Sequence, residues 1–86
     1  MTVELFSSAF CGPCVSTRRV LARAAQLVPA VRVVDVDVAE QVDRAEAAGI
    51  RTTPTVVVRD DAGTEVFRAE GVPTLPQVLV AMARVA

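Results

Sequence analysis

Residues 7–16 read SSAFCGPCVS and contain both cysteines of this 86-residue chain, Cys11 and Cys14, with a Gly-Pro dipeptide between them. A short β-rich run, TVELFS, precedes the cysteines, and a long helical pattern over residues 12–28 follows. Cys11 is therefore expected where a strand ends and a helix begins. The unpaired N–H groups and the positive dipole end of that helix would favour a thiolate at this position. Pro13 suits the first turn of a helix, where its missing N–H costs no hydrogen bond.

Three interpretations of the cysteine pair compete. A zinc site would need more ligands, and the chain has no other cysteine and no histidine, so carboxylates or a second chain would have to complete it. A purely structural disulfide would close a very short loop, which constrains the unfolded chain little. A redox pair fits the placement, because Cys14 lies one helical turn beyond Cys11, within reach of it but more shielded. Cys11 would attack a substrate disulfide, and Cys14 would resolve the mixed disulfide, leaving both cysteines oxidised.

The rest of the chain alternates strand and helix patterns. The stretch VRVVDVDV, residues 31–38, predicts a strand with alternate valines on one face and the two aspartates on the other. Gly49 follows a short helical pattern, at the position where a left-handed residue is easiest. Thr74 and Gln77 have the spacing of a capping box. The expected strands are residues 2–7, 31–38, 54–60 and 64–70, and the expected helices are residues 12–28, 40–48 and 75–85.

This order, β-α-β-α-β-β-α, predicts an α/β fold with a central mixed four-stranded sheet flanked by three helices. The two helical crossovers are expected to make the first three strands parallel, and the hairpin adds an antiparallel edge strand. Within the first helix, Val20, Ala24 and Leu27 are expected to form the inner stripe, with Leu21, Ala25 and Val28 beside it. The length, with no repeat or linker, predicts one domain over residues 1–86.

Composition narrows the class of function. Nine arginines against ten acidic residues give a net charge of −1, and no basic stripe or aromatic ladder predicts binding to nucleic acid. The longest apolar run, residues 78–83, is too short to span a membrane. Residues 1–10 carry no pattern of a secretion signal, so we expect a cytoplasmic protein. In that compartment a Cys-x-x-Cys pair indicates redox or metal chemistry more than a structural disulfide.

Three segments of the chain resemble the thioredoxin family. The motif CGPC, residues 11–14, is typical of thioredoxins and differs from the motifs common in glutaredoxins and periplasmic oxidants. The segment GIRTTPTVVV, residues 49–58, is similar to the family's cis-proline strand, and EVFRAEGVPT, residues 65–74, is similar to its hairpin return. The resemblance covers essentially the whole chain. The family's extra N-terminal strand and helix are missing, so the chain resembles the small, glutaredoxin-sized thioredoxins.

The resemblance implies a thioredoxin-like fold with Cys11 and Cys14 as catalytic residues. It also implies that Thr53-Pro54 is a cis peptide facing the cysteines, so that the Thr53 backbone can pair with an extended substrate segment. A trans Pro54 at the start of a strand is the alternative. No metal or bound cofactor is expected. The groove for the substrate backbone is expected to be formed by Phe10, Gly12, Pro13, Thr53, Pro54 and Gly71.

The chain departs from the family pattern at three places. Phe10 stands where thioredoxins usually have tryptophan, so it can form an apolar lip but donates no hydrogen bond. Leu5 occupies the position of a buried aspartate, and Asp35 falls where the lysine partner of that aspartate would be. One hypothesis is that Asp35 assists proton transfer at Cys14, and the alternative is an ordinary strand aspartate. The segment 71–74 lacks the second glycine and the acid with which glutaredoxins bind glutathione.

The function implied is dithiol–disulfide exchange by a monomeric reductant of protein disulfides. Its expected partners are protein disulfides and an NADPH-dependent flavoprotein, thioredoxin reductase, as electron donor. Two alternatives remain open. One is a glutaredoxin-like enzyme that uses glutathione or a dedicated partner, and the other is a redox-sensing or binding module without turnover.

Overall fold

The computed structural model describes residues 1–85, and its helices and strands follow the predicted order. Each begins and ends within two residues of its expected bounds. The strands are β1 (Thr2–Ser7), β2 (Arg32–Asp37), β3 (Thr55–Arg59) and β4 (Glu65–Glu70), and the helices are α1 (Gly12–Leu27), α2 (Val42–Ala47) and α3 (Leu75–Ala83).

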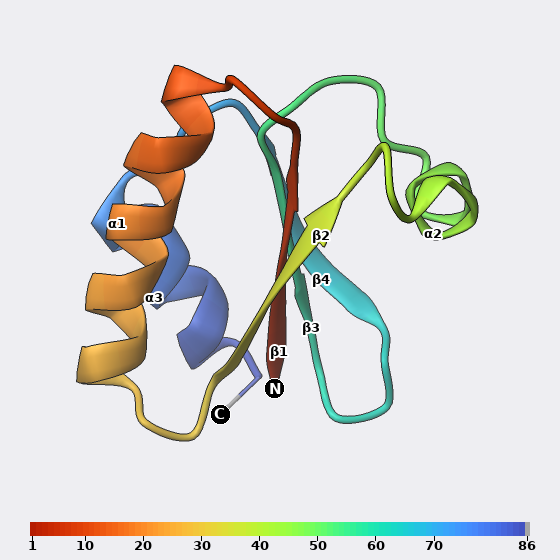
Figure 1. The fold of residues 1–86 in the computed structure, drawn as a ribbon. Coiled ribbons are helices and arrows are strands. Elements are labelled where there is room, and N and C mark those ends of the chain that lie inside the picture. Colours follow the sequence, from red (N-terminus) through yellow and green to blue (C-terminus); the bar gives the residue numbers. More distant parts are fainter. Residues whose placement is uncertain (86) are drawn as a thin grey trace.

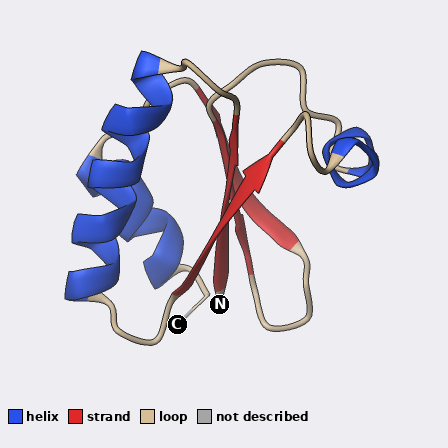
Figure 2. Ribbon diagram, in the orientation of Figure 1, coloured by secondary structure: helices blue, strands red, loops and turns tan. Residues whose placement is uncertain are grey.

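The four strands form one mixed sheet in the order β2-β1-β3-β4. Figure 1 shows α1 and α3 side by side on one face of the sheet and α2 alone on the other. The same division into two helical layers around the sheet is visible in Figure 2. The predicted fold class, a mixed four-stranded sheet flanked by three helices, is confirmed.

The expected direction of β3 is wrong. β1 and β2 are parallel, but β3 is antiparallel to β1, with Thr55 opposite Phe6 and Arg59 opposite Thr2. The connection between β2 and β3 runs through α2, whose six residues span only about 9 Å, whereas a strand of six residues spans about 20 Å. Figure 1 shows α2 nearly end-on, so its axis crosses the strand direction. The connection does not return the chain along the sheet, and β3 starts at the end where β2 stopped.

Helix α1 buries a slightly different stripe from the expected one. Its buried residues are Cys14, Thr17, Leu21 and Ala24, spaced three and four apart as one helix face requires. Leu27, expected on the inner side, is 48% exposed. The buried face of α1 begins at Cys14, and Leu27 does not lie on the line that the buried residues define.

Two apolar clusters hold the layers together. The larger lies between the sheet and the helices α1 and α3, and the smaller lies between the sheet and α2. The larger cluster consists of Val3, Leu5, Leu21, Ala24, Val56, Val58, Val78, Ala81 and Met82, and the smaller of Phe6, Val36, Ala45 and Val57.

Among residues 1–85, no helix combines the length and the apolar character needed to cross a membrane.

The strand directions bring three connecting segments to one end of the sheet. β1 ends at Ser7, β3 begins at Thr55 beside Phe6, and β4 ends at Glu70 opposite Thr55. Helix α1 begins at this same end, which lies at the top of Figure 1. The segments that follow β1, precede β3 and follow β4 therefore lie next to one another.

Candidate active site

Cys11 and Cys14 form a disulfide at the N-terminal end of α1. Cys11 is the N-cap residue, and its Sγ accepts a hydrogen bond from the backbone N–H of Cys14 at 3.1 Å. Cys14 is fully buried, whereas Cys11 is half-buried and Gly12 and Pro13 beside it are exposed. In the reduced protein the same N–H and the helix terminus would stabilise a thiolate on Cys11. The pair thus has one accessible sulfur and one shielded sulfur, as the sequence predicted.

The Thr53-Pro54 peptide bond is cis, as the resemblance implied. Pro54 is buried, and its carbonyl oxygen accepts a hydrogen bond from the backbone N–H of Gly71 at 2.8 Å. Gly71 has a φ of 92°, a left-handed conformation that glycine adopts without a steric penalty. Within residues 1–85, the N–H and C=O groups of Thr53 form no hydrogen bond with the rest of the chain. They therefore remain available to a ligand.

Ser8 is a member of this site that the sequence analysis missed. Its Oγ lies 2.8 Å from Thr53 Oγ1, and both side chains are half-buried. This bond joins the segment that leads to the cysteines to the segment that leads into β3. The doubled serine at residues 7–8 was visible in the sequence, but nothing local indicated a partner 45 residues away.

Phe10, directly before the first cysteine, is fully exposed at 108% and has a φ of 56°. A left-handed backbone is unfavourable for a residue with a side chain, by about 1–2 kcal/mol. The ring is not packed against other residues, so no burial offsets this cost. An aromatic side chain therefore lies in solvent next to the disulfide. The position is consistent with the apolar lip that the sequence analysis expected.

Asp35 is part of a polar network beside α1. Its Oδ1 accepts a hydrogen bond from Ser7 Oγ at 2.6 Å, and its Oδ2 accepts one from Arg18 Nε at 2.7 Å. Partial burial raises the pKa of Asp35, but the hydrogen bonds from Arg18 and Ser7 and the charge of Arg18 outweigh burial and lower it. No hydrogen bond links Asp35 to Cys14 within residues 1–85. Asp35 is thus held ionised by its neighbours.

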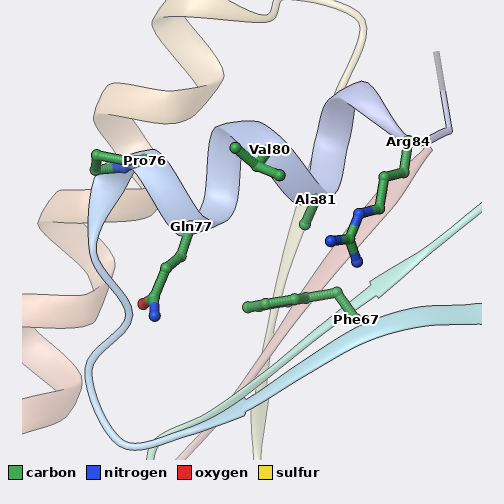
Figure 3. Close-up of a pocket in the computed structure, with 6 residues that line it drawn as sticks. All are labelled: Phe67, Pro76, Gln77, Val80, Ala81 and Arg84. Carbon is green, nitrogen blue, oxygen red and sulfur yellow. The ribbon is translucent and has the colours of Figure 1, made fainter.

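One groove of the structure lies away from the cysteines. It has a volume of about 310 Å³ and runs between α3 and β4, where Figure 3 shows the Phe67 ring below α3, between the side chains of Gln77 and Arg84. None of the expected site residues lines it. A smaller cavity of about 240 Å³ includes Thr53 and lies beside α2. Size alone therefore does not identify the redox site, and the cysteines and the cis-proline do.

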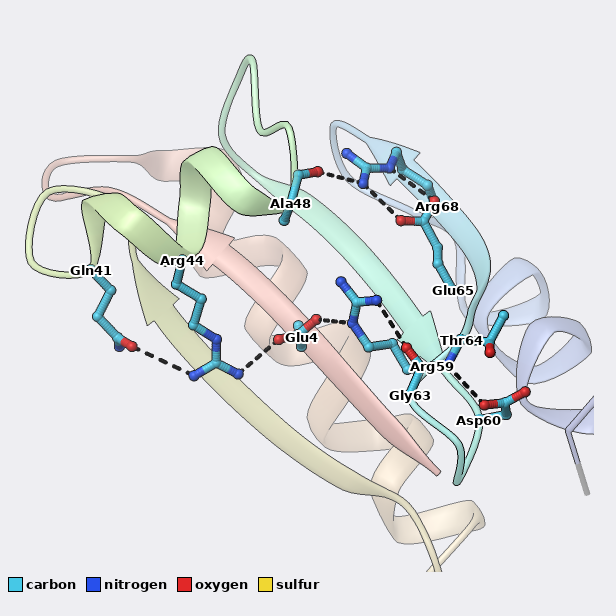
Figure 4. Close-up of polar contacts among 10 residues, drawn as sticks. All are labelled: Glu4, Gln41, Arg44, Ala48, Arg59, Asp60, Gly63, Thr64, Glu65 and Arg68. Carbon is cyan, nitrogen blue, oxygen red and sulfur yellow. Dashed lines mark hydrogen bonds and ion pairs between the residues drawn. The ribbon is translucent and has the colours of Figure 1, made fainter.

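A charged cluster covers the part of the sheet that α2 leaves uncovered (Figure 4). Glu4 of β1 is buried and accepts hydrogen bonds from Arg59 Nε at 2.6 Å and Arg44 Nη2 at 2.7 Å. Burial raises the pKa of Glu4, but the hydrogen bonds and charges of Arg59 and Arg44 outweigh burial and lower it. The sequence analysis did not find this cluster, because its members are far apart in the chain. Its role is to fasten α2 and β3 to the central strand.

The geometry defines a class of protein. A mixed four-stranded sheet, a Cys-x-x-Cys disulfide at the start of α1 and a cis-proline at the neighbouring end of β3 are the features of a thioredoxin-like thiol–disulfide oxidoreductase.

Comparisons with known proteins agree with this class. The family model described as Thioredoxin matches residues 1–83, so the chain belongs to the thioredoxin family. Oxidised mitochondrial thioredoxin 3 from Saccharomyces cerevisiae is 30% identical with a TM-score of 0.80, over 96% of this chain and 76% of that one. A mutant thioredoxin from Halobacterium salinarum is 26% identical with a TM-score of 0.88, over 98% of this chain and 73% of that one. Thioredoxin 1 from Thermosipho africanus, 21% identical over 98% of this chain and 92% of that one, shares the fold with a TM-score of 0.84. No curated protein sequence gave a match.

Proposed function

We propose that the protein reduces disulfide bonds in other proteins through the Cys11–Cys14 dithiol. The observation that carries this proposal is the asymmetry of the pair. Cys11 is the more accessible sulfur and sits at the helix N-cap, whereas Cys14 is fully buried beneath it. An accessible thiolate at a helix N-terminus is the attacking group that exchange needs, and a shielded neighbour can react only with the first cysteine.

The reaction transfers two electrons from the cysteine pair to the substrate. The Cys11 thiolate attacks one sulfur of the substrate disulfide, forms a bond to it and releases the other substrate sulfur, which takes up a proton. The Cys14 thiolate then attacks Cys11 Sγ, forms the Cys11–Cys14 bond and releases the first substrate sulfur as a thiol. The substrate ends as a dithiol and the protein ends in the disulfide form described above.

The substrate backbone would lie over the segments around the disulfide. The unpaired N–H and C=O groups of Thr53 would bond an extended substrate segment like an added strand. Phe10 would cover an apolar side chain of the substrate on the other side of Cys11. Gly12, Pro13, Pro54 and Gly71 would form the floor, because their small or rigid backbones allow a close approach.

We further propose that the protein acts as a monomeric single domain in the cytosol, where a reducing environment suits a dithiol reductant. A flavoprotein thioredoxin reductase that draws on NADPH would return the disulfide to the dithiol. No metal or bound cofactor takes part in this scheme. Size-exclusion chromatography of the reduced and oxidised protein tests the monomer.

The experiment that tests the proposed function is insulin disulfide reduction with two electron sources. One arm contains NADPH and thioredoxin reductase, and the other contains NADPH, glutathione reductase and glutathione. Turnover in the first arm is expected, and Cys11→Ser and Cys14→Ser should each abolish it. Cys14→Ser alone should accumulate a mixed disulfide with insulin, visible on a non-reducing gel.

The alternatives predict different outcomes. Turnover only with glutathione would identify a glutaredoxin-like enzyme, and one stoichiometric oxidation without turnover would identify a redox sensor. Zinc bound to the reduced protein at half an equivalent per chain would point to a site shared between two chains.

A further inference from the structure

The Ser8–Thr53 hydrogen bond is the one side-chain link between the cysteine segment and the cis-proline segment within residues 1–85. The two hydroxyl oxygens are 2.8 Å apart, and either can be the donor. Ser8 lies three residues before Cys11, and Thr53 forms the cis peptide with Pro54. The bond therefore links the segment that carries the attacking sulfur to the backbone on the opposite side of the groove.

The two adjacent serines have different tasks because a strand directs successive side chains to opposite faces. Ser7 is buried on the α1 side of the sheet, where its hydroxyl donates to Asp35. Ser8 is on the α2 side, toward Thr53, which also lines the cavity beside α2. Ser7 thus belongs to the packing of α1, and only Ser8 reaches the groove.

Two hydrogen bonds on either side of Thr53 do not involve its side chain. Gly71 N–H donates to the Pro54 carbonyl, which fixes the segment toward β4. Thr55 Oγ1 donates to the Thr52 carbonyl at 2.7 Å, which fixes its internal turn. The ladder between β1 and β3 ends at the pair Phe6–Thr55. Beyond that pair, the Ser8–Thr53 bond is what joins the Thr53 peptide to the segment that leads to Cys11.

We propose that Ser8 is a positioning residue for the substrate: it holds the Thr53 backbone at the distance from Cys11 that an extended polypeptide needs in order to pair with Thr53 while its sulfur meets Cys11. This rests on the proposed function, and it adds that recognition of a polypeptide, as distinct from a small disulfide, depends on Ser8. A small disulfide without a neighbouring backbone does not use Thr53, so its reaction with Cys11 does not depend on Ser8.

The test compares two disulfides that present the same leaving group. One is free cysteine linked to thionitrobenzoate, and the other is a short alanine-based peptide whose central cysteine carries the same group. In a Cys14→Ser background, Cys11 attacks the cysteine sulfur, forms a mixed disulfide with it and expels thionitrobenzoate, whose release is followed by absorbance. The ratio of the peptide rate to the cysteine rate isolates the contribution of the groove.

With Ser8 present, the peptide should react faster than free cysteine. Ser8→Ala and Thr53→Val should each lower the ratio of the peptide rate to the cysteine rate about two- to tenfold, the range set by one neutral hydrogen bond. Ser8→Ala and Thr53→Val combined should cost no more than either alone, because both remove the same bond. Ser8→Thr should restore the ratio, and Ser16→Ala on the exposed surface of α1 serves as the matched control.

Three results would overturn the inference: a ratio near one with Ser8 present, a ratio unchanged in both Ser8→Ala and Thr53→Val, or an equal fall of both rates, which would mean that Cys11 itself is disturbed. Insulin turnover by the protein with both cysteines is measured separately. If insulin turnover fails but Ser8→Ala still lowers the ratio, the proposed reductase function is rejected and the role of Ser8 stands. If insulin turnover occurs but Ser8→Ala and Thr53→Val leave the ratio unchanged, the reductase function stands and the role of Ser8 is rejected.

Discussion

Arg18 and Asp35 face each other across α1 and β2, with Arg18 Nε 2.7 Å from Asp35 Oδ2. Ser7 occupies the other oxygen of the same carboxylate. This arrangement argues against the hypothesis that Asp35 exchanges protons with Cys14. A carboxylate that has a lowered pKa and accepts two hydrogen bonds stays ionised near neutral pH.

The first prediction is that Asp35→Asn leaves the pH profile of disulfide reduction unchanged near neutral pH. An ionised carboxylate paired with arginine neither gives nor takes a proton there. The rate of insulin reduction, measured from slightly acid to slightly alkaline pH, checks this. The proton-transfer hypothesis would be supported if Asp35→Asn lost or shifted one arm of the pH–rate profile while Arg18→Gln kept the profile of the natural protein.

A second prediction concerns the buried carboxylate of Glu4. Glu4→Gln should lower the free energy of unfolding by about 1–3 kcal/mol, because it removes the anion that two arginines share. The side chains of Arg44 and Arg59 are 43% and 28% exposed, so water relieves part of the loss and the upper end for buried pairs is not expected. Urea denaturation measures the change, and Glu46→Gln on the exposed side of α2 should change stability by less than about 0.5 kcal/mol.

The third prediction follows from the pKa of Glu4, which is lower in the folded protein than in the unfolded chain. The unfolded chain then binds a proton first as the pH falls, so the stability that Glu4 contributes is complete above about pH 4–5 and is lost as pH falls through the folded pKa. The natural protein should therefore be more stable than Glu4→Gln at neutral pH, and the denaturation curves of the two proteins should converge as the pH is lowered. A difference between the two that stays constant down to about pH 2 would contradict it.

The fourth prediction concerns the left-handed backbone of Phe10. Phe10→Gly should be more stable than Phe10→Ala by about 1 kcal/mol, since only glycine adopts this conformation without strain. Both variants lose the exposed ring, so both should reduce insulin more slowly. Thermal unfolding and insulin reduction on the same samples separate the two effects. Equal stability of the two variants would show that the backbone relaxes when the ring is removed.

The fifth prediction concerns the start of α3. Thr74 Oγ1 accepts the backbone N–H of Gln77, and Gln77 Oε1 accepts that of Thr74, so Thr74→Ala should destabilise the protein by about 1 kcal/mol. Thr64→Ala in the exposed hairpin is a control of the same chemistry, with an expected change below about 0.5 kcal/mol. Insulin reduction by Thr74→Ala should be unaffected at temperatures where it is folded.

Features with a local cause could be predicted from the sequence. The capping box of Thr74 and Gln77 depends on residues three apart, and the cysteine pair depends on one helical turn. The cis bond of Pro54 came from the resemblance alone. The Ser8–Thr53 bond and the Glu4 cluster could not be predicted, because they depend on how distant segments are placed in space.

The direction of β3 shows the limit most clearly. A parallel β3 would place Pro54 at the far end of the sheet from Cys11, about 20 Å away, so the expected parallel strands and the expected cis-proline site excluded each other. The path of the connection through α2 distinguishes them, and the pattern at residues 40–48 did not reveal that the axis of α2 would cross the strand direction. The motif, and not the topology rule, was the better guide.

The placement of the N-terminus has a practical consequence. The N-terminus lies at the end of the sheet opposite the start of α1, as Figure 1 shows. A second protein fused to Met1, or an anchor on a solid support, would point away from the disulfide. The molecule can therefore be tethered or joined to another module at Met1 with its reactive face still open to large partners.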